Sequence, residues 1–356
     1  MRGGTSRALF FHERDLPPAG AERDGILLAA LGSPDPYGRQ LDGLGGGISS
    51  LSKACIIGPP THPDADVDYT FAQVHVTRPL VDYAGNCGNC SAAVGPFAID
   101  EGLVPATEGE TLVRIHNTNT KKLLVARVPV SGGEAAVAGD FELPGVPGRG
   151  ARIALDFLDP GGAGTGRLLP TGHARDVVEH VPASLVDATN PVVFVRAGDL
   201  GLAGTESPAA LDADRGLAGR LEAIRVGAAA MMGLPGSAAT PKIALVAPPA
   251  AFAALDGTAY GPERTDLVAR VISMGNCHRA FALTAAMCLA VAARIDGTVV
   301  QEAAGPPTPR DLRLGHPSGV LPLAAEVAPG PLAKRVTVYR TARRLMEGFV
   351  LVPALR

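Results

Sequence analysis

Hydrophobic and polar residues alternate along much of the chain in a way that predicts short strands separated by turns. Residues 67–76, with the sequence VDYTFAQVHV, alternate apolar and polar positions with a period of two. Other runs of strand length are rich in Val, Ile, Leu or Phe and occupy residues 8–11, 54–57, 123–130, 151–157 and 191–195. We therefore expect mostly β-structure.

Two longer runs break this pattern and predict helices. Residues 91–102 and 280–295 are rich in Ala, Leu, Val and Met, and each run follows a glycine-containing turn. The apolar composition predicts that both helices are buried. The pattern has two strand-rich halves, and each half contains one apolar helix. It predicts an α+β protein with two similar halves and disfavours the parallel βαβ array of nucleotide-binding folds.

The length of 356 residues predicts two domains, because a single hydrophobic core rarely grows so large. A Gly- and Pro-rich tract at 159–170 and a polar break at 197–214 interrupt the strand pattern. We place the boundary near residue 185. The predicted domains are 1–185 and 186–356, and the last residues of the second can return to the first.

Charge and composition exclude several classes of protein. A formal net charge of −3 provides no basic field for nucleic acid. The longest apolar stretch, residues 281–293, is too short to span a bilayer, and no signal peptide is recognisable. Five cysteines without regular spacing indicate a reducing compartment, so we expect a cytoplasmic protein. The basic run Arg340, Arg343 and Arg344 has helical spacing and predicts a solvated helix face without a function.

The tripeptide Gly-Asn-Cys occurs twice, as Gly85-Asn86-Cys87 and as Gly275-Asn276-Cys277, in each case before a predicted helix. A thiol at a helix N-terminus meets free N–H groups that favour anions and lower a cysteine pKa. The same N–H groups can bind a substrate carboxylate. The alternative is that both cysteines are small buried hydrophobic residues beside tight turns.

Cys87 and Cys90 also have the C-x-x-C spacing of redox dithiols and of half a zinc site. Neither function is well supported. The remaining Cys and His residues do not repeat the pair as a four-ligand zinc site requires, and the βαβ setting of a redox dithiol is missing. We expect no metal.

Lys53 ends a glycine-rich segment, GLGGGISSLSK at 43–53, and precedes an apolar strand. The segment is not a phosphate-binding loop, because no Ser or Thr follows the lysine. Burial against the strand would favour the neutral amine and make it a usable base, whereas an exposed lysine at a strand edge is the alternative.

The turns MRGGTSR at 1–7 and HPSG at 316–319 suit carboxylate binding, although each alone is more often an ordinary turn.

Several motifs together resemble the PrpF family of methylaconitate, methylitaconate and oxalomesaconate isomerases. They are MRGGTSR at 1–7, LGSPDPYGRQLDGLGGG at 31–47, SSLSK at 49–53, GNCGNCSAAVGPFAI at 85–99, HPSG at 316–319 and RTARRLMEG at 340–348. The resemblance covers nearly the whole chain. It implies the diaminopimelate-epimerase-like fold, in which two pseudo-symmetric α+β domains each wrap a mostly antiparallel sheet around a central helix. In the family a strand precedes the first motif, and we expect this chain to lack it.

The resemblance also implies a function, namely a 1,3-proton shift on a small unsaturated di- or tricarboxylic acid without metal or organic cofactor. Lys53 matches the essential lysine of the family and Cys87 its cysteine turn, so we expect Lys53 to transfer the proton and Cys87 to assist. Cys277 would be the counterpart in the second half, although family members commonly have a residue other than cysteine there. They also commonly have an apolar residue at the position of Cys90. The resemblance makes the following residues candidates for binding substrate: Arg2, Gly4, Thr5, Ser6, Ser49, Asn86, Gly88, Asn89, Met274, Gly275, Asn276, His316, Pro317, Ser318 and Gly319.

Two other functions stay open at this point. Cys87 and Cys277 together suggest a two-base cysteine racemase or epimerase. A non-catalytic accessory protein of an aconitase-like dehydratase is the other alternative. Expected partners are therefore a small polycarboxylic acid, an aconitase-like dehydratase and a second copy of the chain in a homodimer.

Overall fold

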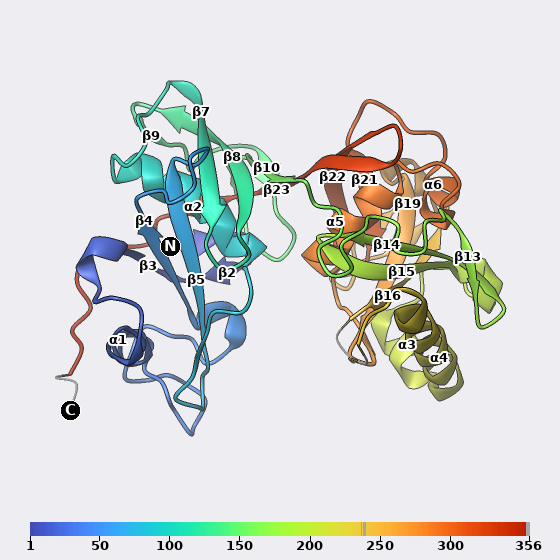
Figure 1. Ribbon diagram of the computed structural model, residues 1–356, viewed down its shortest axis with the longest axis horizontal. Coiled ribbons are helices and arrows are strands. Elements are labelled where there is room, and N and C mark those ends of the chain that lie inside the picture. The colour runs from blue at the N-terminus through green and yellow to red at the C-terminus, as the bar shows by residue number, and fades with distance from the viewer. Residues whose placement is uncertain (236, 238–239, 354–356) are drawn as a thin grey trace. The chain divides into compact units, whose positions relative to one another are not determined.

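The chain folds into two compact units. The computed structural model describes residues 1–235, 237 and 240–353. The first unit comprises Met1–Phe157 and Tyr339–Arg356, and the second comprises Leu158–Val338 (Figure 1). The expected boundary near residue 185 instead falls inside strand β14 (Val181–Ala188). The difference arises because the Gly- and Pro-rich tract that suggested the boundary is a loop of the second unit, not a linker.

The first unit is built on a mixed sheet in the order β3-β4-β5-β7-β8-β12. Its principal strands are β3 (Leu9–His12), β4 (Lys53–Gly58), β5 (Val67–Val74), β7 (Gly109–Asn117), β8 (Lys122–Ser131) and β12 (Ile153–Leu158). Its short strands are β1 (Arg2–Gly3), β2 (Ser6–Arg7), β6 (Val81–Asp82), β9 (Glu134–Ala135), β10 (Phe141–Glu142), β11 (Arg149–Gly150) and β24 (Ala342–Arg343). Its helices are α1 (Ala21–Leu31) and α2 (Gly88–Asp100).

The second unit has a sheet in the order β13-β14-β15-β16-β19-β21-β22-β23. In addition to β14, its strands are β13 (Asp176–Val178), β15 (Asn190–Arg196), β16 (Lys242–Ala247), β17 (Phe252–Ala253), β18 (Ala259–Tyr260), β19 (Leu267–Ser273), β20 (Asn276–Cys277), β21 (Leu312–His316), β22 (Gly319–Ala328) and β23 (Leu332–Arg340), whose last two residues belong to the first unit. Its helices are α3 (Pro208–Ala213), α4 (Arg215–Met231), α5 (Leu283–Ala292) and α6 (Val299–Ala304).

The two units repeat one connectivity. In the first, helix α1 joins the parallel pair β3 and β4, and α2 joins the parallel pair β5 and β7. In the second, α3 and α4 join the parallel pair β15 and β16, while α5 and α6 join β19 and β21. The remaining neighbours in each sheet are antiparallel. The α+β fold with two similar halves is thus confirmed.

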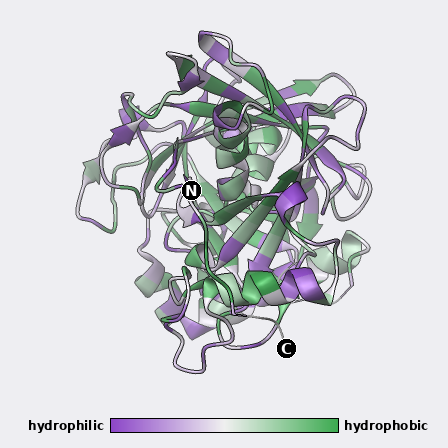
Figure 2. Ribbon diagram, turned by 90° about the vertical axis from the view of Figure 1, so that its left-hand side faces the viewer, coloured by the Kyte–Doolittle hydropathy of each residue, from purple (hydrophilic) through white to green (hydrophobic). Residues whose placement is uncertain are grey.

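The apolar runs that predicted helices are the most buried helices of the two units. Every α2 residue from Cys90 to Ile99 is buried, as is every α5 residue from Ala285 to Ala292. In Figure 2 hydrophobic colouring runs through the strands and central helix, and purple residues lie mainly toward the outside. Helix α1 covers a different part of the first sheet, where Leu27 and Leu31 pack against Ala54 and Ile56 of β4.

The basic run near the end of the chain is not a helix face. Arg340 ends β23 and Arg343 lies in β24, where it pairs with Arg2. The helical spacing of the three arginines therefore gave a wrong prediction. The segment is extended instead, because its backbone N–H and C=O groups pair with those of strand β1, and a short helix would leave several of them without partners. The Arg344 guanidinium donates from Nη1 to Glu101 Oε1 at 2.6 Å, so it too is fixed by the fold rather than solvated freely.

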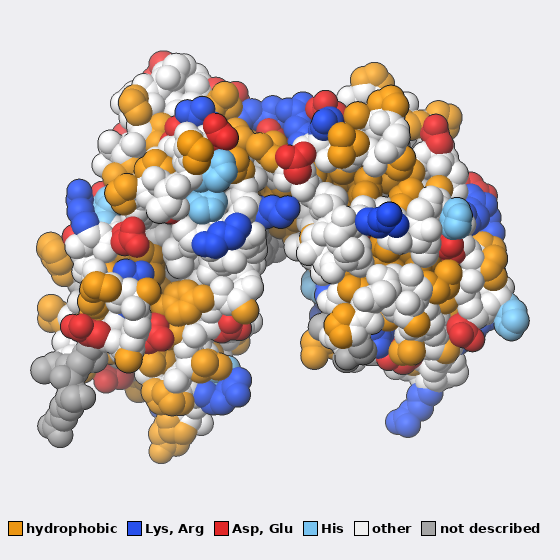
Figure 3. Space-filling model, viewed as in Figure 1, with side chains coloured by type: hydrophobic (Ala, Val, Ile, Leu, Met, Phe, Trp, Pro, Cys, Tyr) orange, Lys and Arg blue, Asp and Glu red, His pale blue; other side chains and the backbone are white. Residues whose placement is uncertain are grey.

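The surface view agrees with the modest net charge. On the face shown in Figure 3, acidic and basic side chains are interspersed on each unit. Among the residues that the structure describes, no helix is long and apolar enough to cross a membrane.

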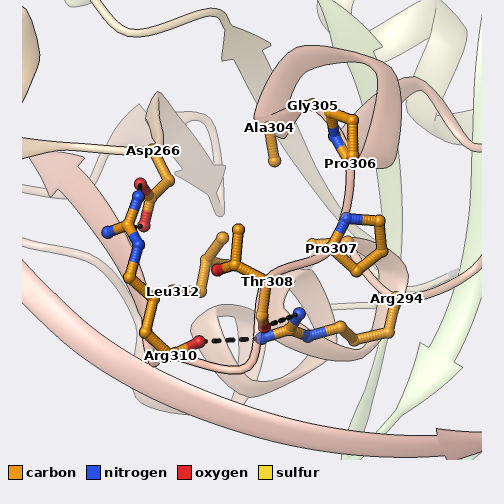
Figure 4. Close-up of a pocket in the computed structure, with 10 residues that line it drawn as sticks. Asp266, Arg294, Ala304, Gly305, Pro306, Pro307, Thr308, Arg310 and Leu312 are labelled. Carbon is orange, nitrogen blue, oxygen red and sulfur yellow. Dashed lines mark hydrogen bonds and ion pairs between the residues drawn. The ribbon is translucent and has the colours of Figure 1, made fainter.

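A small cavity in the second unit lies beside the loop after α6 (Figure 4). Its volume of about 40 Å³ has room for water molecules only. Its two arginines are already engaged: Arg294 donates to the carbonyl oxygens of Thr308 at 2.7 Å and Arg310 at 3.1 Å, and Arg310 pairs with Asp266 at 2.7 Å. These contacts fix the loop, and we assign no ligand to the cavity.

Substitution by alanine should have opposite effects on stability at two helical glycines. A Cβ at Gly95 in α2 would lie 2.7 Å from Val128 Cγ2 and 3.1 Å from Ala126 Cβ, whereas one at the exposed Gly219 in α4 would meet nothing within 4 Å. We expect Gly95→Ala to destabilise the first unit by about 1–3 kcal/mol through overpacking. Gly219→Ala should stabilise the second by about 0.5–1 kcal/mol by restricting the unfolded chain. Urea unfolding of both variants tests this, and a Gly95→Ala protein as stable as wild type would contradict the packing described.

Candidate functional site

Lys53 is a buried lysine on the face of the first sheet. It begins β4 with 8% of its surface exposed, and it stands directly opposite Gln73 in the antiparallel ladder with β5. Its ammonium donates to Gln73 Oε1 and lies 4.9 Å from the centre of the Phe71 ring. No carboxylate among the described residues pairs with it. The alternative of an exposed lysine at a strand edge is therefore wrong.

Gln73 fixes both the lysine and the loop before it. While Oε1 accepts from Lys53, Nε2 donates to the carbonyl oxygens of Ser49 at 3.1 Å and Ser52 at 2.9 Å. Sequence reasoning missed this residue. The available signal was a polar residue in the apolar phase of strand 67–76, on the same face as Tyr69 and Phe71, where burial requires a hydrogen-bonding partner.

The glycine-rich segment is held by a second buried amide. Gln40 is 1% exposed and donates from Nε2 to Ser33 Oγ at 2.8 Å and Ser52 Oγ at 2.6 Å. Its Oε1 accepts from the Gly47 N–H at 3.0 Å, and Gly47 has a φ of 72° that other residues rarely adopt. The segment is thus wrapped around Gln40 and positions Lys53.

Cys87 lies at the start of α2, as the first Gly-Asn-Cys turn predicts. It is the N-cap residue, and its sulfur accepts from the Cys90 N–H at 3.5 Å. The same sulfur lies 3.9 Å from Ser6 Oγ. Gly88 is the first residue of the helix, and the Asn86 side chain accepts from Ser91 Oγ at 3.2 Å. The turn is therefore fixed to the first turn of the helix it precedes.

The thiol of Cys87 belongs to a buried cluster that favours its protonated form. The hydrogen bond with the Cys90 thiol and burial raise the pKa of Cys87 well above its ordinary value. A hydrogen bond with Cys55 does the same to the pKa of Cys90, and burial raises that of Tyr69. The expected lowering of the Cys87 pKa by the helix N-terminus is thus wrong, because neighbouring thiols and burial outweigh it. Near neutral pH Cys87 can donate a proton.

The N-terminal motif gathers around the same helix start. Asn89 Nδ2 donates to Thr5 Oγ1 at 3.0 Å, and a Cβ on Gly4 would lie 2.2 Å from Asn89 Oδ1. The side chain of Arg2 is turned to the backbone, where Nη1 donates to the Gly4 and Thr341 carbonyl oxygens at 3.0 and 2.9 Å. Gly4, Thr5, Ser6 and Asn89 are thus brought together with Cys87.

The second Gly-Asn-Cys does not begin a helix. Met274 and Gly275 have φ values of 53° and 81° and form the tight turn of the hairpin between β19 and β20. Cys277 lies in β20, and the residue that caps α5 is Ala282. The prediction of a thiol at a second helix start is therefore wrong, because two positive φ values at Met-Gly close a hairpin instead.

Cys277 is held in a different environment from Cys87. Its N–H donates to Asp212 Oδ1 at 2.6 Å, and burial together with the Asp212 charge raises the pKa of Cys277 to about 11. A cleft of about 270 Å³ in the second unit borders this hairpin and is lined by Asp212, Arg225, Met274 and Gly275 among others. Asn276, which follows Gly275 in the hairpin, is exposed.

The HPSG segment forms another hairpin turn of the second unit. His316 and Gly319 face each other across Pro317 and Ser318. Ser318 Oγ donates to the Arg279 carbonyl at 2.6 Å, which ties this turn to the loop between Cys277 and α5. The second-unit candidates thus form two turns joined through residues 278–282.

All five cysteines lie in the described part of the chain, residues 1–235, 237 and 240–353. All five thiols are free. Over the same residues, no group of three or more His, Cys, Asp or Glu side chains is arranged to hold a metal ion.

Comparison with known proteins yields a family and several close relatives. The family described as "PrpF protein" matches residues 1–353. The chain is 45% identical to a 3-methylitaconate isomerase of Eubacterium barkeri, over 99% of this chain and 96% of that protein. It is 41% identical to a 4-oxalomesaconate tautomerase of Pseudomonas putida, over 99% and 94%. A crystal structure of methylitaconate-delta-isomerase, 45% identical, superposes with a TM-score of 0.94 over 99% of this chain and 94% of that one.

The contact between Lys53 and Gln73 predicts the effect of adding a charge there. Gln73→Glu places a carboxylate against the ammonium and should hold Lys53 in its charged form to a pH about 1–3 units higher. NMR titration of the lysine Cε signals, with the Lys53 signal assigned by Lys53→Arg, measures this. Gln301→Glu on α6 adds the same charge elsewhere and should leave the signal unchanged. An unshifted titration in Gln73→Glu would contradict the pairing.

Removing the Cys90 thiol should make Cys87 more acidic. Because Cys90 is the largest cause of the raised pKa of Cys87, Cys90→Ala should lower that pKa toward the ordinary value of a thiol. The pH midpoint of Cys87 alkylation by iodoacetamide, followed by mass spectrometry, should then move down. Cys288→Ala, at a buried thiol of the second unit, serves as the control. An unchanged midpoint in Cys90→Ala would show that the two thiols do not interact.

Proposed function

The chain belongs to the PrpF protein family, and we propose that it catalyses a 1,3-proton shift on a small unsaturated di- or tricarboxylic acid. The chain is an isomerase, as its curated relatives are. Those relatives are named for 3-methylitaconate, 2-methylaconitate and 4-oxalomesaconate. All three compounds carry carboxylates on or next to a C=C or C=O unit, and we propose a substrate of this class.

The observation that carries the proposal is the buried ammonium of Lys53, held by Gln73 and facing no protein carboxylate among the described residues. As the amine, Lys53 removes a proton from the carbon next to the double bond, and the C–H electron pair enters the conjugated carboxylate system. The resulting ammonium returns the proton to the far carbon, and the double bond moves by one position. The reaction therefore consumes no oxidant, reductant or second substrate.

Cys87 supports the reaction as a neutral thiol. Its raised pKa keeps the proton on sulfur at neutral pH, so it can donate to the substrate or hold it by a hydrogen bond. The N–H groups at the start of α2 favour the negative charge that develops on the conjugated carboxylates. We assign proton transfer to Lys53 and the assisting role to Cys87.

The geometry does not favour the two-base cysteine alternative. Such a mechanism needs a thiol from each half, and the residue that caps α5, in the place equivalent to Cys87, is Ala282. No observation favours a non-catalytic accessory role. A polycarboxylate ligand, an aconitase-like dehydratase and a second copy of the chain in a homodimer remain our expectations for partners. Five free thiols favour a reducing, cytoplasmic location.

Proton exchange in D2O tests the proposed function. The protein is incubated with 2-methyl-trans-aconitate, 3-methylitaconate or 4-oxalomesaconate, and deuterium uptake and isomer formation are followed by NMR. We expect uptake with at least one acid, and Lys53→Ala should slow it by about 10²–10⁴-fold, the contribution of a general acid–base group. Cys277→Ser should retain turnover, whereas a two-cysteine mechanism requires its loss. Absence of exchange with all three acids would refute the proposal.

A further inference from the structure

Arg340 is a buried arginine beside the site, and the sequence analysis assigned it no function. It is the last residue of β23, and 6% of its surface is exposed. Its Nε donates to Asn89 Oδ1 at 3.1 Å and its Nη1 to the Tyr339 carbonyl at 2.8 Å. Nη2 has no hydrogen-bond partner among the described residues. It is not completely buried, so a ligand can reach it.

The charge of Arg340 is not balanced by the fold. In the described part of the chain, no Asp or Glu pairs with its guanidinium, whereas Arg344 pairs with Glu101 and Arg127 with Asp156. Burial accordingly lowers the pKa of Arg340 to about 10. A buried cation without a counter-charge destabilises a protein, so its presence needs a reason outside the fold.

The surroundings of Arg340 are those of the proposed active site. Asn89, which orients the guanidinium, lies in the first turn of α2, and Cys87 caps that helix within electrostatic reach of Arg340. Gly4 has a φ of 51°, and a Cβ there would lie 3.1 Å from Arg340 Cδ. The N-terminal motif thus approaches the arginine closely because Gly4 has no side chain.

We propose that Arg340 is the counter-charge for one carboxylate of the substrate, with Asn89 orienting its guanidinium at the start of α2. This inference rests on the proposed function, from which the polycarboxylate substrate follows. Arg2 is less suited to the role, because it is only half-buried and water can solvate its charge, whereas Arg340 is buried. A guanidinium on a conjugated carboxylate also stabilises the charge that develops when the proton is removed.

Binding of a non-reacting tricarboxylate tests the inference without relying on turnover. Tricarballylate is titrated into the full-length protein by calorimetry. We expect Arg340→Gln to weaken binding by about 10–100-fold, the effect of losing a hydrogen bond to a charged group. Arg340→Lys keeps the charge but loses the planar fork, so it should fall between. Arg335→Gln, on the exposed part of β23 where Arg335 pairs with Glu326, is the matched control and should bind as wild type does.

Glutarate, which has one carboxylate fewer, identifies the lost contact. Wild type should prefer tricarballylate to glutarate, and Arg340→Gln should lose most of that preference. Circular dichroism and thermal unfolding show that the variants are folded. Should Arg340→Gln not fold, a weakening of several-fold or more in Arg340→Lys supports the inference, and wild-type affinity in that variant overturns it.

The outcomes separate this inference from the proposed function. Unchanged tricarballylate affinity in folded Arg340→Gln, or no binding by wild type at millimolar concentrations, overturns the role of Arg340 even if Lys53-dependent exchange is observed. Loss of affinity in Arg340→Gln without exchange of any unsaturated acid keeps Arg340 as a carboxylate-binding residue and removes the isomerase reaction.

Discussion

The cross-strand pair of Lys53 and Gln73 is the contact on which the first unit's site depends. A lysine at the start of a buried strand needs an acceptor, and a carboxylate would hold it permanently as an ammonium. The neutral amide of Gln73 supplies the acceptor without that charge, and its NH2 group also ties down the preceding loop through Ser49 and Ser52. The amine is thus held in place by a neutral partner.

The face of β4 that carries Lys53 also carries a cluster of thiols and a phenol. Side chains of a strand alternate between the two faces, so Lys53 and Cys55 point to one side of β4 and Ala54 to the other. Ala54 packs against α1, whereas Cys55 is hydrogen-bonded with Cys90 and lies near Tyr69. The hydrogen bond with Cys55 raises the pKa of the Cys90 thiol, and burial raises the pKa of the Tyr69 phenol. Lys53, Arg340 and the start of α2 therefore lie beside no anionic side chain of this cluster, which suits an anionic substrate.

Sequence reasoning identified features with a strong local signal and missed those that depend on pairing across the fold. The buried helices, the main strands and the cap at Cys87 follow from periodicity and turn composition, and the structure has them. Gln73 and Arg340 gain their importance from Lys53 and Asn89, which are distant in sequence. The two identical tripeptides show the limit most clearly. The residue before the second glycine, Met274, takes a positive φ and closes a hairpin, and no pattern in Gly-Asn-Cys itself distinguishes the two turns.

This difference between the halves bears on the kind of reaction that the scaffold suits. Inverting one stereogenic carbon requires proton-transfer groups on opposite faces of that carbon, which a duplicated fold provides when both helix starts carry a thiol. Here α2 starts at Cys87 and α5 at Ala282, so the duplication has kept the connectivity but not the acid–base pair. A 1,3-shift has no such requirement, because one group can remove a proton and return it to the far carbon on the same face. The two proposed proton-transfer groups, Lys53 and Cys87, both lie in the first unit. Their distribution matches a 1,3-proton shift better than inversion of a stereogenic carbon.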